Sequence, residues 1–277
     1  MNALNDKNII LDKLHQLPVM PVVVREVMDS FRNANVGSAV MARKIEFDQG
    51  LSARVLRVAN SSFYGLSREV GSIQDAVMVL GFDTIRSLVV SAGFTHAFPV
   101  IKDDHFDRYA YWVRSFRVAT YTEALTQCLG GVRKLSFTSG LFHDVGQLVL
   151  SICIPEKFAE IVAQQKASGL DLIEVEKSVL GFDHAEIGAE MAKRWNFPLE
   201  IEHAIQYWRT PEHDPSEQLN GVVYVAVLLE SGLRGTALMN KLPLKMRERM
   251  HLSWERIEPS LPPPDQLEAV VKLMLEE

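Results

Sequence analysis

The residues best suited to chemistry are His143 and Asp144, an adjacent pair inside the apolar stretch 135–155. Asp144 is the one formally charged residue of that stretch, whose apolar side chains recur at helical spacing over most of the helix surface. Such a helix belongs in a core, where a bare carboxylate would cost more free energy than a fold can spare. We therefore expect Asp144 to pair with a metal ion, with an Arg or Lys side chain, or with several N–H donors.

His184 is the second histidine whose position suggests chemistry. Asp183 and Glu186 form the D-x-x-E pattern of a capping box, which places His184 at the first position of a helix. The positive end of the helix dipole disfavours an imidazolium and so favours a neutral histidine that could hold a metal. The alternative is a first-turn histidine bonded to a neighbouring side chain, because buried polar groups usually find ordinary partners. The same alternative applies to His143.

The elements that carry these residues are predicted to be helices along the whole sequence. Asp48, Ser72 and Asp83 each precede an apolar pattern of helical period and are predicted N-caps, and Gly181 is a predicted helix end. The stretch 135–155 is predicted to be one continuous buried helix. No strand-like alternation is bounded by hairpin turns, so the sequence indicates an all-α fold.

Composition narrows the class of protein. The chain has 277 residues, 47% of them hydrophobic, and a net charge of −6 with no basic tract, which argues against general nucleic-acid binding. The N-terminus is too polar for a signal peptide, and the most apolar later run, 222–229, is too short to cross a membrane. Cys128 and Cys153 lie in apolar surroundings and indicate reduced thiols of a cytoplasmic protein.

Several stretches, taken in order, carry the pattern of a known family. In the first half they are LPVMP, IEFDQGLSARVLRVANSSFYG and SIQDAVMVLGFDTIRSLVV. In the second half they are YWVRSFRVA, GLFHDVGQLVL, GFDHAEIGAEM and RWNFPLEIEHAI. Over about residues 14–208 the chain resembles the HDOD family, a helical relative of the HD-domain metal-dependent phosphohydrolases.

This resemblance implies an all-α, two-lobed helical bundle whose second lobe is HD-hydrolase-like. We expect an N-terminal helical lobe in 1–100, an HD-related lobe in 105–235, and a linker with a C-terminal helix in 236–277. The polar segment 99–104 is the expected boundary between the lobes. The resemblance also implies a bacterial, cytoplasmic setting and a signalling or regulatory role. The C-terminal helix could pack on its own domain or dock on a partner, and the sequence leaves both open.

HD-type hydrolases hold a metal with a His, an adjacent His-Asp pair and a distant Asp, and the ion acidifies a bound water. By the resemblance, His143 and Asp144 form the pair, and His184 matches a histidine of relatives with two metals. Arg114, however, stands at the position of the first His, and Val227 stands at the position of the distant Asp. Where the pattern often has a His pair, this chain has the dipeptide Tyr-Trp at 207–208.

Two of the four primary ligands are thus replaced by side chains that cannot bind a cation. A guanidinium carries a permanent positive charge, and a valine has no lone pair. We hypothesise that the guanidinium of Arg114 sits where the metal would be and pairs with Asp144. A separation of more than one water molecule between the two would contradict this.

The favoured interpretation is a non-catalytic bacterial signalling module of the HDOD type, which binds a signalling protein or a nucleotide messenger and needs no cofactor. The alternative is a metal-dependent phosphohydrolase with an altered ligand set, in which His143, Asp144 and His184 hold a divalent transition metal. A third interpretation is a helical anion sensor that uses Arg114.

Overall fold

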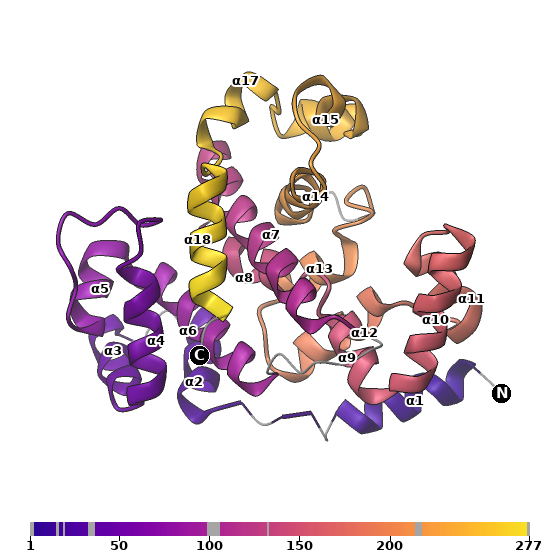
Figure 1. Ribbon diagram of the computed structural model, residues 1–277, viewed down its shortest axis with the longest axis horizontal. Helices are drawn as coiled ribbons and strands as arrows, with labels where there is room; N and C mark the ends of the chain where they lie inside the picture. The colour runs from indigo at the N-terminus through magenta and orange to yellow at the C-terminus, as the bar shows by residue number, and fades with distance from the viewer. Residues whose placement is uncertain are drawn as a thin grey trace.

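The computed structural model describes residues 3–14, 17–18, 20–32, 37–98, 106–131, 133–213 and 218–275. Within these ranges the regular structure consists of α-helices and short 3-10 turns, without a strand, which confirms the predicted all-α fold. The molecule is elongated, with α3, α4 and α5 at one end and α10 and α11 at the other (Figure 1). The expected boundary at 99–104 lies outside the described residues.

The first group of helices forms the end drawn in purple in Figure 1. Its helices are α2 (Val22–Arg32), α3 (Ser38–Glu46), α4 (Gln49–Ala59), α5 (Ile73–Leu80) and α6 (Phe82–Ala97). The predicted caps at Asp48 and Ser72 are confirmed, because each side chain accepts a hydrogen bond from a backbone N–H three residues later, at 3.1 and 3.0 Å. Helix α6 is buried along most of its length and contacts α2, α4 and α5 as well as α8 of the second group.

The predicted cap at Asp83 is wrong. Helix α6 begins at Phe82, directly after Gly81, whose φ of 85° also ends α5. Asp83 therefore lies in the first turn of α6, where its carboxylate pairs with the guanidinium of Arg86. Arg86 is itself buried, between the rings of Phe31 and Phe82. One glycine that ends one helix and starts the next leaves no room for a separate side-chain cap.

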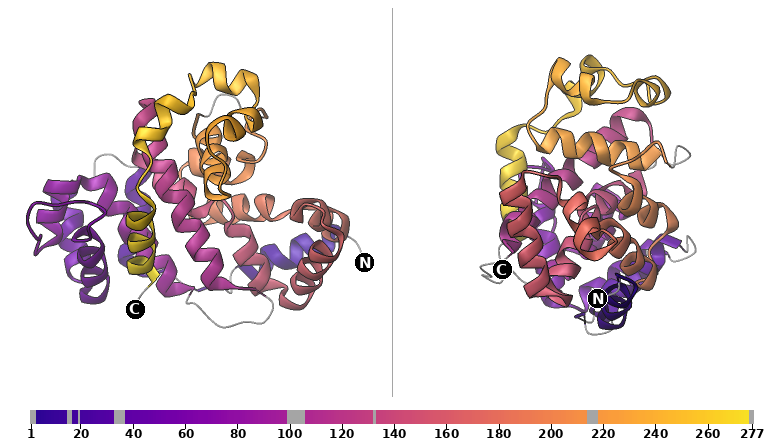
Figure 2. Two further views of the ribbon diagram at one scale, coloured as in Figure 1. Left: turned by 45° about the horizontal axis from the view of Figure 1, so that its top comes forward. Right: turned by 90° about the vertical axis from the view of Figure 1, so that its right-hand side faces the viewer.

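The second group of helices surrounds the long helix α7, which packs against α8, α14 and α18. Its elements are α7 (Arg108–Leu129), η2 (Arg133–Leu135), α8 (Ser136–Phe142), α9 (Val145–Cys153), α10 (Pro155–Ser168), α11 (Leu172–Leu180), α12 (His184–Arg194), α13 (Leu199–Tyr207) and α14 (Gln218–Glu230). Helix α1 (Ala3–Lys13) also lies here, against α9 and α11, although its residues precede those of the first group (Figure 2).

The prediction of one continuous helix over 135–155 is wrong, because the helix breaks at His143 and Asp144 between α8 and α9. The indole N–H of Trp208 donates to the carbonyl of His143 at 3.0 Å. The N–H of Gln147, four residues on, instead donates to the carbonyl of Asp144 at 2.9 Å, in a tighter turn. A tertiary hydrogen bond thus replaces a helical one. No local sequence pattern predicts this replacement.

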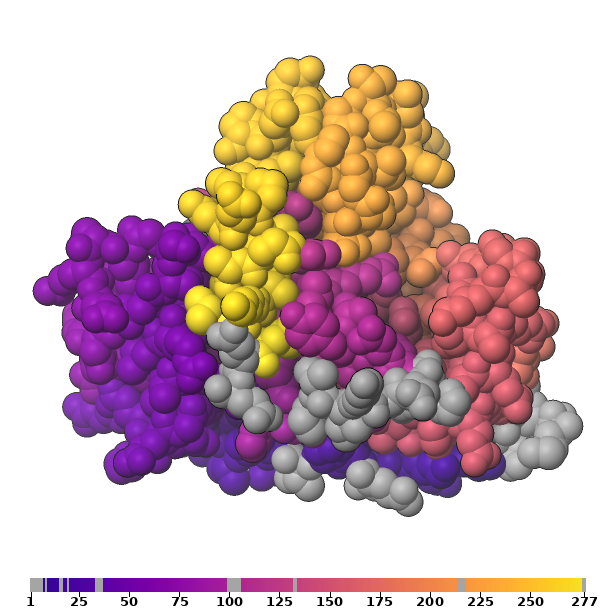
Figure 3. Space-filling model, viewed as in Figure 1, coloured from indigo at the N-terminus to yellow at the C-terminus, as the bar shows by residue number. Residues whose placement is uncertain are grey.

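The C-terminal part contains more helix than the expected linker and single helix. Its elements are α15 (Gly235–Lys241), α16 (Leu244–Arg249), α17 (Trp254–Ile257), η3 (Glu258–Ser260) and α18 (Pro264–Leu275). Helix α18 contacts α7, α4 and α6, and buries Leu267, Val270, Val271 and Met274. It covers the front of the seam between the first group and α7 (Figure 3). Of the two alternatives left open by the sequence, α18 therefore packs on its own chain.

In the part of the chain that the structure describes, none of the helices combines the length and the apolar character that crossing a membrane requires.

Candidate functional site

The four candidate residues meet at one place in the second group of helices. Arg114 comes from α7, His143 and Asp144 from the break between α8 and α9, and His184 from the first turn of α12. Asp144 Oδ2 lies 3.1 Å from Arg114 Nη1 and 3.4 Å from His143 Nε2, and Asp144 Oδ1 lies 3.4 Å from His184 Nε2. Asp144 and both imidazoles are buried, so the carboxylate is surrounded by potential cations inside the core.

Both histidines are held in the same way, with Nε2 turned toward Asp144. His143 Nδ1 lies 2.7 Å from the carbonyl oxygen of Gly140. His184 Nδ1 lies 2.7 Å from Oε2 of Glu176, which also accepts the backbone N–H of His184 at 2.9 Å. A hydrogen bond at one ring nitrogen fixes the orientation and the tautomer of an imidazole, so each ring presents Nε2 to the carboxylate.

His184 carries a proton on both ring nitrogens in this arrangement. Burial lowers the pKa of His184, but the contact with Asp144 and the hydrogen bond to Glu176 outweigh burial and raise this pKa to about 9. The sequence argument favoured a neutral imidazole because of the helix dipole. That effect amounts to about 0.3–1 kcal/mol at an exposed helix end, which is less than two carboxylates in direct contact provide.

The pKa of Asp144 moves in the opposite direction. Burial alone would raise the pKa of this carboxyl group, but the imidazoles of His143 and His184 and the guanidinium of Arg114 lower it well below its usual value. Asp144 is therefore ionised throughout the physiological pH range, and Arg114 and His184 contact it as cations.

The free energy of unfolding is expected to fall in mild alkali, because the pKa of His184 is raised in the folded state. Below pH about 6.5 this histidine is protonated in both states, so its contribution to the free energy of unfolding is complete. As pH rises from about 6.5 to about 9, the unfolded state loses its proton first and the contribution disappears. Urea unfolding at a series of pH values should show this decrease, on the order of a few kcal/mol for a fully buried group. A His184→Leu variant should lack it, and an equal slope in both proteins would contradict the assignment.

Glu230 is a site residue that the sequence analysis missed. Its Oε2 lies 3.5 Å from Arg114 Nε, so the guanidinium spans two carboxylates, Asp144 and Glu230. Glu230 follows Val227 by three residues, which places it one helical turn further along α14. That spacing is the signal that could have found it, because Val227 was already matched to the distant ligand position.

Glu176 was missed as well. Its side chain is completely buried. Glu176 lies in α11, eight residues before His184, and its carboxylate pairs with the imidazole of His184. The available signal was weak. A carboxylate four residues before Leu180 lies on the same face of α11 as that buried leucine, and a charge on a buried face needs a partner.

The residues present do not fit the metal centre that HD-type proteins imply. Among the described residues, no group of three or more His, Cys, Asp or Glu side chains is arranged to hold a metal ion. His143, Asp144 and His184 contact one another, and Arg114 brings a permanent positive charge to the remaining side of Asp144. Val227 is buried and offers no ligand atom. The assignment of these residues to a functional site stays a prediction.

A cavity of about 290 Å³ opens beside the ion pair of Arg114 and Asp144. Its apolar lining residues include Phe106, Phe158, Val162 and Leu172. Its polar lining residues are Asp107, Tyr111, Arg114, Ser115, His143, Asp144, Gln147, Gln165 and Lys166. The cavity is large enough for a small organic molecule with a ring and a charged group.

Comparison with known families matches the HDOD domain over residues 17–211. This chain belongs to the HDOD domain family. The family assignment confirms the resemblance to the HDOD family that was drawn from the motifs, and the helices described above agree with the all-α fold that this resemblance implied.

Three relatives illustrate the range of this similarity. A candidate phosphohydrolase from Shewanella amazonensis SB2B is 29% identical, with a TM-score of 0.77 over 96% of this chain and 98% of that one. A candidate signal transduction protein from Marinobacter aquaeolei VT8, 24% identical, shares the fold with a TM-score of 0.80 over 100% and 67%. An uncharacterized Treponema pallidum protein is 25% identical over 210 residues, which are 75% of this chain. The HDOD chain spans 40% of the length of that curated relative.

Proposed function

We propose that this HDOD chain is a non-catalytic signalling module that binds a protein partner or a nucleotide messenger and does not hydrolyse a phosphate ester. The observation that supports the proposal is the guanidinium of Arg114, 3.1 Å from Asp144 and 3.5 Å from Glu230, at the position of the first metal-binding His. The arginine already supplies the charge that a buried carboxylate needs, so Asp144 is stabilised without an ion.

Electrostatics makes a metal at this position unfavourable. A divalent ion about 4 Å from a fixed guanidinium would be repelled by about 8 kcal/mol at an effective dielectric constant of about 20. His184 would also have to lose a proton before its Nε2 could bind a metal, although its pKa is raised to about 9. Asp144 would remain as a ligand, but its negative charge is already shared with three neighbouring groups.

The cavity beside Arg114 supports the part of the proposal that concerns a small messenger. Phe106 and Phe158, whose ring centroids lie 5.7 Å apart, and Lys166 are among the residues that line it. Aromatic side chains suit a planar base, and a lysine suits a phosphate group. A protein partner would instead use the outer surface of the helices.

One observation favours a second candidate, a metal-dependent phosphohydrolase with an altered ligand set. His143 and His184 both present Nε2 to Asp144 while Nδ1 is held by a carbonyl or a carboxylate. Histidines that bind metals are commonly oriented in this way. His143, Asp144 and His184 would be its ligands if Arg114 turned away.

Metal analysis combined with a phosphodiesterase assay tests the proposal. The purified HDOD chain, incubated with Mn²⁺ or Fe²⁺ and desalted, is expected to retain well below one equivalent of metal and to leave bis(p-nitrophenyl) phosphate unhydrolysed. The Arg114→His variant restores an imidazole at this position and removes the repelling charge, so it should retain more metal than the wild type. One equivalent of metal in the wild type, with turnover that Asp144→Ala abolishes, would instead establish the second candidate.

A further inference from the structure

The ion pairs of the candidate site continue beyond Arg114 to the surface. Acidic and basic side chains alternate through seven residues from five helices and the α8–α9 break. We call this the ion-pair network, and its members in order are Glu176, His184, Asp144, Arg114, Glu230, Arg117 and Glu268. The successive distances are 2.7, 3.4, 3.1, 3.5, 3.7 and 2.5 Å. The network therefore joins a buried site to the C-terminal helix α18.

The carboxylates of the network become more exposed along this order. The side chain of Glu176 is 0% exposed, Asp144 2%, Glu230 15% and Glu268 57%. A buried carboxylate depends on a nearby cation far more than an exposed one, because water solvates the exposed group. Arg117 lies between Glu230 and Glu268. It should therefore pair with Glu230 rather than with Glu268 whenever Glu230 lacks another cation.

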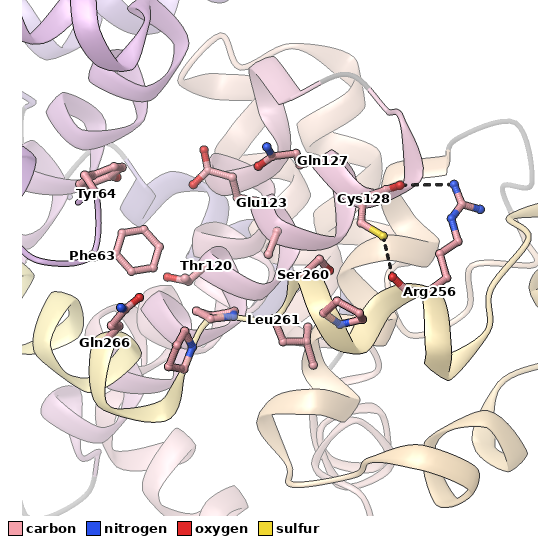
Figure 4. A pocket seen from close by; sticks show the side chains of 14 residues that line it. Phe63, Tyr64, Thr120, Glu123, Gln127, Cys128, Arg256, Ser260, Leu261 and Gln266 are labelled. Carbon is pink, nitrogen blue, oxygen red and sulfur yellow. Dashed lines mark hydrogen bonds between the residues drawn. The ribbon is translucent and has the colours of Figure 1, made fainter. Parts of the chain in front are cut away.

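Helix α18 also shapes a cavity of about 630 Å³. Figure 4 shows four residues that line this cavity: Gln266 of α18 lies below Phe63, and Thr120 of α7 and Leu261 lie to the right of them. Gln266 is two residues from Glu268, and Thr120 is three residues from Arg117. A shift of α18 against α7 therefore changes the shape of this cavity.

We propose that the ion-pair network couples the Asp144 site to the position of α18. An anionic group that enters the cavity beside Asp144 draws Arg114 away from Glu230, Arg117 moves to Glu230, and Glu268 loses its partner. Helix α18 then loses the ion pair that joins it to α7 and loosens. This coupling rests on the proposed function, since it describes how an occupied site would be signalled to the surface.

Hydrogen exchange of the α18 amides, measured by mass spectrometry on the metal-free full chain, tests this coupling. Glu268→Gln removes the last ion pair and should speed exchange in α18 about threefold, the effect expected of one exposed ion pair. Arg114→Met should speed it by a similar factor, although Arg114 is three contacts away from Glu268 in the network. The double variant should exchange no faster than either single variant, because both changes break the same connection.

Lys44→Met is the matched control. It removes an exposed ion pair of 2.9 Å with Glu26, outside the network, and should leave α18 unchanged. If Arg114→Met does not fold, Arg114→Lys serves instead, since a lysine keeps the charge near Asp144 but lacks the fork that reaches Glu230. Unchanged exchange in α18 for the Arg114 variant, or strictly additive effects in the double variant, would overturn the coupling. This result is separate from the metal and turnover assay, so either proposal can fail alone.

Discussion

Replacing Gly146 with alanine is expected to lower the free energy of unfolding of the HDOD chain by about 3 kcal/mol or more. A β-carbon at Gly146 would lie 1.7 Å from the carbonyl oxygen of His184 and 3.0 Å from the backbone nitrogen of Gly188. Both neighbours are backbone atoms of α12, so no side-chain rotation can relieve the contact. Helix α12 cannot move freely either, because His184 is held between Asp144 and Glu176.

Urea unfolding followed by circular dichroism measures this effect. Gly71→Ala is the matched control, because a β-carbon at Gly71 has no atom within 4 Å and its φ lies outside the left-handed region. The control should differ from the wild type by less than about 0.5 kcal/mol. If Gly146→Ala were equally mild, α9 and α12 could not approach one another as closely as described.

Replacing His184 with leucine is expected to cost about 3–5 kcal/mol, the range found when one partner of a buried ion pair is removed. Glu176 is completely buried, and the imidazole of His184 is the cation that it contacts at 2.7 Å. Asp144 would lose the contact with this cation as well. The variant therefore leaves a buried charge without compensation, which is far more costly than the loss of packing alone.

A second substitution separates this charge effect from the loss of volume. His184→Leu combined with Glu176→Leu removes both charges and should recover much of the lost stability, because an apolar pair can replace a buried ion pair at little cost. Chemical denaturation of the two single variants and the double variant gives the coupling energy. Strict additivity of the two single effects would show that the pair does not interact, contrary to its geometry.

Local sequence patterns were sufficient for much of the fold. Asp48, Ser72 and Asp183 cap helices through hydrogen bonds to N–H groups three residues later, as predicted from their types and spacing. Capping depends on residues within one turn, so a linear sequence contains all the information that it requires. The family motifs are similarly local, and they identified the HDOD family before any distance was known.

Local patterns did not predict the break in the helix at His143 and Asp144. Apolar spacing over 135–155 is compatible with one helix, and only the indole of Trp208, 65 residues later, removes the hydrogen bond that would continue it. Glu230, which pairs with Arg114, was not predicted for a related reason. Its contact with Arg114 joins α14 to α7 across more than one hundred residues, and the spacing from Val227 indicates a shared helix face but not which residue of α7 lies opposite.

The all-α fold, the HDOD family and the need of Asp144 for a partner all follow from the order of the amino acids, because helical period, family motifs and the cost of a buried charge can be recognised in short stretches. The packing of the helices sets which groups surround Asp144, makes His184 a cation and brings α18 back onto its own chain. These depend on distances between helices that are remote in sequence, and electrostatic interactions change steeply with distance and burial.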